Sequence, residues 1–197
     1  MLGEKSTLLA FPVTDPTCST VNGNTVCDPS WSASLDSTAR FPVLSSDEST
    51  VYVTTANGTL YAIDATNGNV LWHAAVGASS PPALSGGTVF VGTSAGTLVA
   101  LDGAGCGQTT CTPLWSGTTS ATTRVQPAVA GGVVSTGSDD GSLHAFSAAG
   151  CGNATCTALW TYQTGSKVTG APALGANHLV VGTADGNVRA FAVRSGS

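Results

Sequence analysis

The sequence predicts an all-β fold, a β-propeller of four-stranded blades, from three features that recur at a common interval. Tryptophans repeat 41, 43 and 45 residues apart, a proline follows each of them, and a glycine marks the same turn in each repeat. The tryptophans are Trp31, Trp72, Trp115 and Trp160, the prolines Pro42, Pro82, Pro127 and Pro172, and the glycines Gly58, Gly96, Gly141 and Gly186. A period of about 40 to 45 residues filled with short β-rich runs is typical of propeller blades.

The repeat that begins near Pro82 illustrates how one blade is built. Its four strands are expected at residues 82–84, 88–91, 97–102 and 114–115. Glycines in the turns between them suit the positive φ angles of tight hairpins. The second strand, Val89-Phe90-Val91, is apolar throughout, which is typical of strands covered on both faces. Each blade therefore needs a neighbour on either side.

The repeats predict one propeller domain, residues 1–197, that contains about four blades. Complete blades are expected at residues 41–80, 81–126 and 127–171, between a partial blade at 1–40 and another at 172–193. Either Trp31 completes the last blade and closes a four-bladed ring, or the chain is an open arc, half of a larger propeller. We favour the arc, whose uncovered blade edges invite self-association. The polar residues 194–197 resemble a natural chain end, so any missing blades are expected before residue 1.

The composition argues against several classes of partner. The 197 residues carry six basic and eleven acidic side chains, a net charge of −5, and the basic residues are scattered singly. This pattern argues against binding of nucleic acid or of an anionic membrane surface. No apolar stretch approaches the length of a membrane span. No signal peptide is visible, because Glu4 and Lys5 closely follow Met1.

The six cysteines form three local pairs, each between the third strand and the tryptophan-bearing fourth strand of a repeat. The pairs are Cys18 with Cys27, Cys106 with Cys111, and Cys151 with Cys156. Zinc binding would require pairs to combine across blades or to recruit histidine, but the three histidines occupy other parts of the repeat. We favour three disulfides, each closing its own loop, where facing residues come within bridging distance. Disulfides indicate an oxidising compartment, so we expect an exported protein, in the cell envelope or extracellular.

One segment of the first complete repeat resembles the tryptophan-docking motif of quinoprotein-like (PQQ-like) β-propellers. That motif has Ala, Asp, Thr-Gly and Trp at fixed spacing. The matching residues are Ala62, Asp64, Gly68 and Trp72, and Asn67 stands in place of the usual Thr. The resemblance covers nearly the whole chain. We expect all four tryptophans to have a structural role, with each ring packed between blades.

The family includes quinoprotein alcohol dehydrogenases, so an enzymatic function has to be weighed. Those enzymes hold pyrroloquinoline quinone with an adjacent Cys-Cys disulfide, a stacking Trp, and Glu, Asn and Asp around a calcium ion. This chain has no adjacent cysteines and only two glutamates, Glu4 and Glu48, and its tryptophans are assigned to docking. Other motifs such as G-x-S-x-G, a phosphate-binding loop or H-E-x-x-H are absent from the sequence. We therefore expect no catalytic residue, no cofactor and no metal site.

The leading functional hypothesis is an exported, non-catalytic propeller that acts as a binding or scaffolding module. The resemblance supports this hypothesis, because the family also includes an outer-membrane assembly lipoprotein that serves in protein interaction. The alternative is a fragment of a PQQ-dependent quinoprotein dehydrogenase.

The positions of the basic residues predict a candidate ligand face. Arg40, Arg124 and Lys167 each precede a repeat proline by two to five residues, which is expected to place them in the links between blades. Asp140 and Asp185 lie in turns expected on the same face of the propeller. Such a cluster on an otherwise acidic protein would attract a small anionic group or an acidic protein segment. The alternative is that solvated loops simply carry charges.

Overall fold

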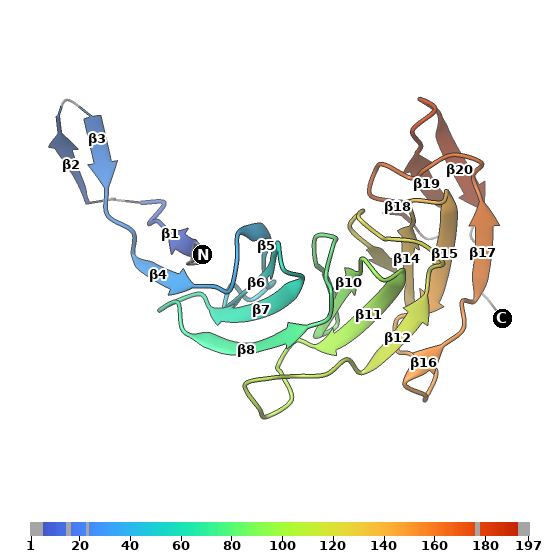
Figure 1. Cartoon of the computed structure of the whole chain (residues 1–197), viewed down its shortest axis with the longest axis horizontal. Helices are drawn as coiled ribbons and strands as arrows, with labels where there is room; N and C mark the ends of the chain where they lie inside the picture. The colour runs from blue at the N-terminus through green and yellow to red at the C-terminus, as the bar shows by residue number, and fades with distance from the viewer. Residues whose placement is uncertain (1–5, 15–16, 23, 176–177, 193–197) are drawn as a thin grey trace.

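The chain folds into an open arc of antiparallel sheets, not a closed ring (Figure 1). The computed structural model describes residues 6–14, 17–22, 24–175 and 178–192, so residues 194–197 lie outside the described part. The regular elements in these ranges are all β-strands. No helix that could span a membrane occurs among the described residues. The predicted all-β propeller arc is therefore confirmed.

Three sheets form the complete blades. The first blade contains β5 (Ala39–Leu44), β6 (Thr50–Thr55), β7 (Thr59–Asp64) and β8 (Val70–Ala75). The second contains β9 (Ala83–Ser85), β10 (Thr88–Gly92), β11 (Thr97–Asp102) and β12 (Trp115–Thr118). The third contains β13 (Ala128–Ala130), β14 (Val133–Gly137), β15 (Ser142–Ser147) and β17 (Trp160–Gln163). The strands of each blade pair in chain order, and the fourth strands lie along the convex side of the arc (Figure 1).

Partial sheets stand at both ends of the arc. At the N-terminal end, β1 (Thr7–Ala10) pairs with β4 (Trp31–Ser34), and β2 (Cys18–Val21) and β3 (Asn24–Cys27) form a separate hairpin. At the C-terminal end, β18 (Ala173–Leu174), β19 (His178–Gly182) and β20 (Val188–Ala192) supply the first three strands of a further blade. The third strand expected near Leu8 and the fourth strand expected at Trp31 thus pair with each other.

A small residue faces each tryptophan across the sheet. The cross-strand partners are Ala10 with Trp31, Ala62 with Trp72, Ala100 with Trp115, and Ala145 with Trp160. The alanines of the three complete blades are fully buried. Because alanine projects only a methyl group, the aromatic ring beside it has room to pack against the next blade at the density of a protein interior.

The hydrophobic core lies between blades rather than inside any one of them. Trp115 of the second blade packs against Phe90 of the same blade and Phe146 of the third, with ring centroids 6.1 and 6.0 Å apart. Phe90 and Phe146 are fully buried, and Trp115 is 4% exposed. Tilted aromatic pairs of this kind add to the free energy gained from burial of apolar surface. The blades therefore stabilise one another, as their apolar second strands predict.

Each docked tryptophan lies on the turn that follows the third strand of the next blade. The indole N–H of Trp31 donates to the carbonyl of Ala65 at 2.7 Å, and that of Trp72 donates to the carbonyl of Gly103 at 3.1 Å. A glycine lies against the ring in these turns. At Gly150, where φ is +80°, a Cβ would lie 2.7 Å from the tryptophan docked there. This position therefore requires glycine for its backbone conformation and for the close approach of the ring.

Each cysteine pair forms a disulfide within its own loop, as the spacing in the sequence predicts. The bonds join Cys18 to Cys27, Cys106 to Cys111, and Cys151 to Cys156, with sulfur–sulfur distances of 2.07, 2.13 and 2.09 Å.

The disulfide loops of the second and third blades also pair with the outer strand of the blade before them. The Cys111 amide donates to the carbonyl of His73, and the His73 amide donates to the carbonyl of Thr109, both at 2.9 Å. The second loop forms β16 (Thr155–Cys156), which pairs in parallel with β12. Each loop thus covers a strand edge that a four-stranded blade leaves open.

Candidate functional site

Two basic residues of the predicted ligand face meet at one carboxylate, that of Asp139. The Nε of Arg124 lies 3.1 Å from Asp139 Oδ2, and the Nζ of Lys167 lies 2.9 Å from Oδ1. Arg124 belongs to the link between β12 and β13, Lys167 to the link between β17 and β18, and Asp139 to the turn between β14 and β15. We call these three residues the Asp139 cluster. Two successive links thus converge on the turn between them.

Backbone and side-chain hydrogen bonds hold this turn in place. The Asp139 amide donates to the carbonyl of Thr122 at 2.9 Å, which joins the turn to the preceding link. The carboxylate of Asp140 accepts from the Ser138 hydroxyl and, at 2.9 Å, from the Ser142 amide. Asp140 therefore stabilises its own Asp-Gly turn, and its carboxylate is engaged within the protein.

The Asp139 cluster leaves its positive groups open to solvent. The side chains of Arg124 and Lys167 are 59% and 44% exposed, against 27% for Asp139. Partial burial acts to raise the pKa of the Asp139 carboxyl, but hydrogen bonds from Lys167 and Arg124 outweigh it and hold the pKa below its ordinary value. Asp139 is therefore ionised at neutral pH. Ion pairs this exposed contribute roughly 0–1 kcal/mol, so an arriving anion can compete for both cations.

Asp185, the second acidic residue of the predicted face, is engaged within the last blade. Its carboxylate pairs with Arg189 on β20, at 2.9 Å between Nη2 and Oδ2. It also accepts from the Thr183 hydroxyl and the Asn187 side chain. These contacts, that with Arg189 above all, hold the pKa of Asp185 well below its ordinary range. Asp185 therefore stabilises the turn of its blade, as Asp140 does in the third blade.

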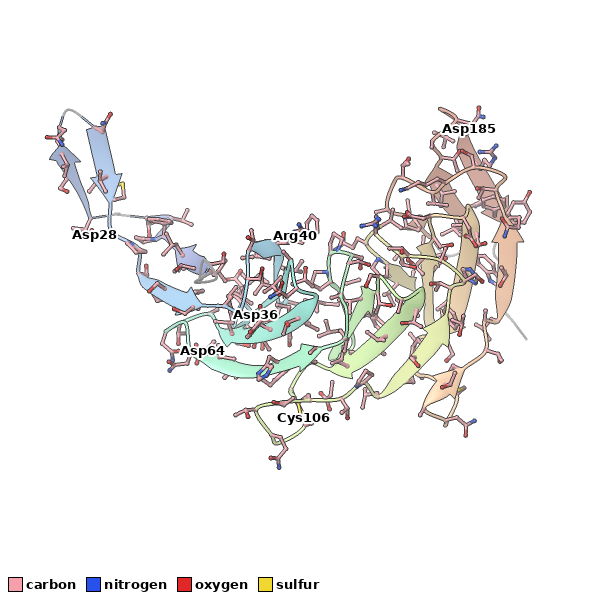
Figure 2. The ribbon with its side chains drawn as sticks, in the orientation of Figure 1. Asp28, Asp36, Arg40, Asp64, Cys106 and Asp185 are labelled. Carbon is pink, nitrogen blue, oxygen red and sulfur yellow. A yellow bond between two sulfur atoms is a disulfide. The ribbon has the colours of Figure 1, made fainter. Side chains whose placement is uncertain are left out.

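Arg40 lies inside strand β5, so its predicted place in a link between blades is wrong. The strand begins at Ala39, and Arg40 pairs with Thr54 of β6 before a bulge. Figure 2 places Arg40 on the concave side of the arc. Its side chain is exposed, and no ion pair between described residues involves it. The structure therefore does not join Arg40 to the Asp139 cluster.

A cleft that the sequence did not predict lies between the first and second blades. It has a volume of about 640 Å³ and is lined by the β5–β6 loop, the β9–β10 turn and Gly103-Ala104. The cleft is lined by loops that follow first and third strands, whereas Asp139 lies in a turn that follows a second strand. In an antiparallel blade these two kinds of connection lie at opposite ends of the strands. The cleft and the Asp139 cluster therefore open on different faces. The Tyr52 hydroxyl donates to Gly103 at 3.0 Å, and Asp47 accepts from Ser45 at 2.6 Å. The volume suits a small molecule, but these polar groups of the lining are paired with one another.

His144 on β15 is a buried titratable residue that the sequence presents as an ordinary strand position. It is 4% exposed, its Nδ1 lies 3.3 Å from the Thr161 hydroxyl, and its Nε2 has no hydrogen-bond partner among the described residues. Burial lowers the pKa of the imidazole, although the charge of Asp140 acts in the opposite direction. The ring is therefore neutral at neutral pH, and it stacks against Phe146.

The described residues do not fit the quinone site that the family resemblance implies. No two cysteines are adjacent, and all six are joined in loop disulfides. Trp31, Trp72 and Trp115 are docked on neighbouring blades. Glu48 lies in the exposed β5–β6 loop, and Glu4 lies outside the described residues. Within the described ranges, no group of three or more His, Cys, Asp or Glu side chains is placed to hold a metal ion.

Solved structures with the same fold include natural and designed proteins. BamB from Moraxella catarrhalis has a TM-score of 0.66 at 22% identity, over 94% of this chain and 59% of that chain. The computationally designed Ika8 protein has a TM-score of 0.69 at 21% identity, over 85% of this chain and 50% of that chain. The quinohemoprotein alcohol dehydrogenase ADHIIG from Pseudomonas putida HK5 has a TM-score of 0.61 at 20% identity, over 78% of this chain and 30% of that chain. These likenesses show the fold, and this chain spans about half the length of BamB and of Ika8.

The arc and its tryptophan-docking turns define a propeller of PQQ-like repeats. The chain belongs to the family described as outer membrane protein assembly factor BamB, whose profile matches residues 21–150 and 106–197. A search of curated proteins found no significant match.

Proposed function

We propose that this chain is an exported, non-catalytic propeller that acts as a binding or scaffolding module for an acidic protein segment. The observation that carries the proposal is the Asp139 cluster, where two exposed cations from successive links meet on one loop face. The protein as a whole has a net charge of −5, so the two cations offer a local site of opposite sign. The family description as an outer membrane protein assembly factor supports a role in protein interaction.

The geometry of the cluster suits a carboxylate-bearing partner. Arg124 contacts Asp139 through Nε, which leaves the terminal nitrogens of the guanidinium as donors for a second carboxylate. Lys167 has three N–H donors, of which the ion pair with Asp139 uses one. Asp139 therefore orients both cations and leaves donors on each for an incoming acidic side chain.

The three disulfides support export. Cytosolic thiols are kept reduced, so structural disulfides of this kind persist in the cell envelope or outside the cell. All six cysteines of the chain are joined, which fits a protein that works in an oxidising compartment.

Binding of a fluorescein-labelled oligoglutamate peptide, followed by fluorescence anisotropy at several salt concentrations, tests the proposed function. The double variant Arg124→Glu/Lys167→Glu should bind at least about tenfold more weakly, because both attractive charges become repulsive. Its melting temperature should stay nearly unchanged, because the replaced side chains are exposed. Arg40→Glu is the matched control for the single variants Arg124→Glu and Lys167→Glu, because it makes the same change of charge outside the cluster, and it should keep most of the binding.

Two results would contradict the proposed function. Equal losses in Arg124→Glu, Lys167→Glu and Arg40→Glu would mean that the peptide senses only the overall charge of the protein. Binding that survives the double variant would mean that the ligand uses another surface, such as the face that carries the cleft.

A fragment of a PQQ-dependent quinoprotein dehydrogenase is the alternative function, and it rests on the likeness to ADHIIG. Addition of pyrroloquinoline quinone with calcium discriminates between the two functions. We expect neither a bound-cofactor spectrum nor saturable dye reduction. Observation of both would refute the non-catalytic proposal.

A further inference from the structure

Within the chain, disulfide loops cover the outer strand of the preceding blade at a constant register. This holds for the disulfide loops of the second and third blades. The residue after the tryptophan of the preceding blade pairs in parallel with the residue before the second cysteine of the loop. These pairs are His73 with Thr110 and Ser116 with Thr155. A disulfide loop therefore covers the outer strand of the preceding blade in two successive blades, at the same register.

The third outer strand, β17, has no such cover in the described part of the chain. Its residue after the tryptophan is Thr161, which is exposed together with Tyr162 and Gln163. Tyr162 is 48% exposed, and its ring packs against Phe191 of the last blade with the ring centroids 4.4 Å apart. An open strand edge with exposed apolar side chains is a site where another strand can pair.

The β2–β3 hairpin is a disulfide loop that pairs with no further strand in the described part of the chain. It stands away from the arc (Figure 1), and all its strand residues except Cys27 are exposed. Val21 and Val26 are 51% and 47% exposed. The hairpin leads into β4 as the other disulfide loops lead into β12 and β17. Val26, the residue before the second cysteine, is therefore the counterpart of Thr110 and Thr155.

The hairpin and β17 complement each other but belong to opposite ends of the arc (Figure 1). A single copy of the described arc does not bring them together, whereas two copies in head-to-tail order do. Residues 17–27 and 160–163 contain no charged side chain. Their contact therefore has no charge to desolvate, which would otherwise oppose association.

The same order of two copies also completes the last blade. Among the described residues, the sheet of β18, β19 and β20 has no fourth strand, and β4 is a fourth strand paired with β1 alone. β1 and β20 are equivalent third strands, and both are marked by Ala-Phe, at residues 10–11 and 190–191. Ala10 pairs with Trp31, so β20 of a second copy can pair with the same edge of β4, with Ala190 opposite Trp31, once β1 is released from that edge.

We propose that two copies of this chain associate head to tail into one closed propeller. In this ring the β2–β3 hairpin of each copy covers β17 of the other, and β4 of each copy completes the last blade of the other. Each copy then contributes three complete blades and the parts of one composite blade, so two copies make eight blades. This inference is independent of the Asp139 cluster.

Size-exclusion chromatography with light scattering tests the ring first. The chain has a mass of 19.4 kDa, and we expect a single compact species of twice that mass. A monomer at every accessible concentration would overturn the proposal. A ladder of larger masses would overturn it as well, because it would mean that the arcs add end to end without closing.

Cross-linking between two variants that each carry one added cysteine tests the register. Neighbouring strands lie about 4.8 Å apart, within the range over which a disulfide joins two residues. A mixture of Val26→Cys and Thr161→Cys chains should therefore form a covalent dimer under mild oxidation. The matched control mixes Ser19→Cys with Thr161→Cys. Ser19 pairs with Val26 across the hairpin, so it lies one strand further from β17, about 10 Å away, and should not cross-link.

The three positions are exposed, so the variants should keep the native far-UV circular dichroism spectrum. A cross-link from Val26→Cys that is at least tenfold faster than from Ser19→Cys supports the proposed register. Equal rates from the two positions, or no cross-link in a protein of dimer mass, would overturn it.

Discussion

Replacement of Trp115 by alanine removes the ring that joins the second and third blades. The side chain is 4% exposed and packs between Phe90 and Phe146. A buried aromatic side chain hides roughly 150–250 Å² of surface, which at about 25 cal/mol per Å² corresponds to about 4–6 kcal/mol. The unfolded chain already hides part of that surface. We therefore expect Trp115→Ala to lower the free energy of unfolding by about 3–5 kcal/mol.

Urea unfolding followed by far-UV circular dichroism, with the disulfides intact, measures this loss. Leu114→Ala is the matched control, because Leu114 is the preceding residue and is 54% exposed, so its loss should stay within about 0.5 kcal/mol. Gly150→Ala perturbs the docking from the other side, because its Cβ would lie 2.7 Å from the Trp115 ring, and it should destabilise the protein as well. If Trp115→Ala cost no more than Leu114→Ala, the ring would not be docked and this reasoning would fail.

Two further predictions concern the third blade. Replacement of Cys151 and Cys156 by serine should cost about 2 kcal/mol of unfolding free energy through the lost loop closure. It should also speed hydrogen exchange at the Ser116 amide, measured by mass spectrometry, because this amide donates to the disulfide loop at 2.9 Å. Unchanged exchange would mean that the loop covers β12 even without its disulfide. For His144, burial lowers the pKa in the folded state, so the unfolded chain takes up the proton first and stability falls as the pH drops below about 6.5. His144→Val should reduce the difference in unfolding free energy between pH 7 and pH 5, and an unchanged difference would assign that pH dependence to other groups.

The candidate site was predictable in part. Arg124 and Lys167 stand at similar distances before repeat prolines, so the repeat itself indicates that they lie in equivalent links. Asp139 was not assigned to the ligand face because its turn position holds uncharged residues, such as Ala56 and Ser94, in other blades. A repeat pattern carries no signal at a position where one blade differs from the rest.

The prediction for Arg40 failed for a different reason. Its spacing to Pro42 matches that of a link residue, but β5 begins at Ala39 and so includes Arg40. A proline is tolerated in an edge strand, and β5 is the edge strand of its sheet. The proline therefore did not mark the start of the strand.

The sequence by itself determined the propeller repeat, the disulfide pairing and the tryptophan column. The repeat and the tryptophan column are visible because turn glycines, apolar strands and tryptophans recur at one interval, and the disulfide pairs are visible because each closes a short loop. Only the tertiary structure decided that disulfide loops cover preceding blades and that two links share Asp139. Such contacts join different blades, as His73 and Thr110 do, and spacing along the chain does not say which edges of two packed blades will face each other.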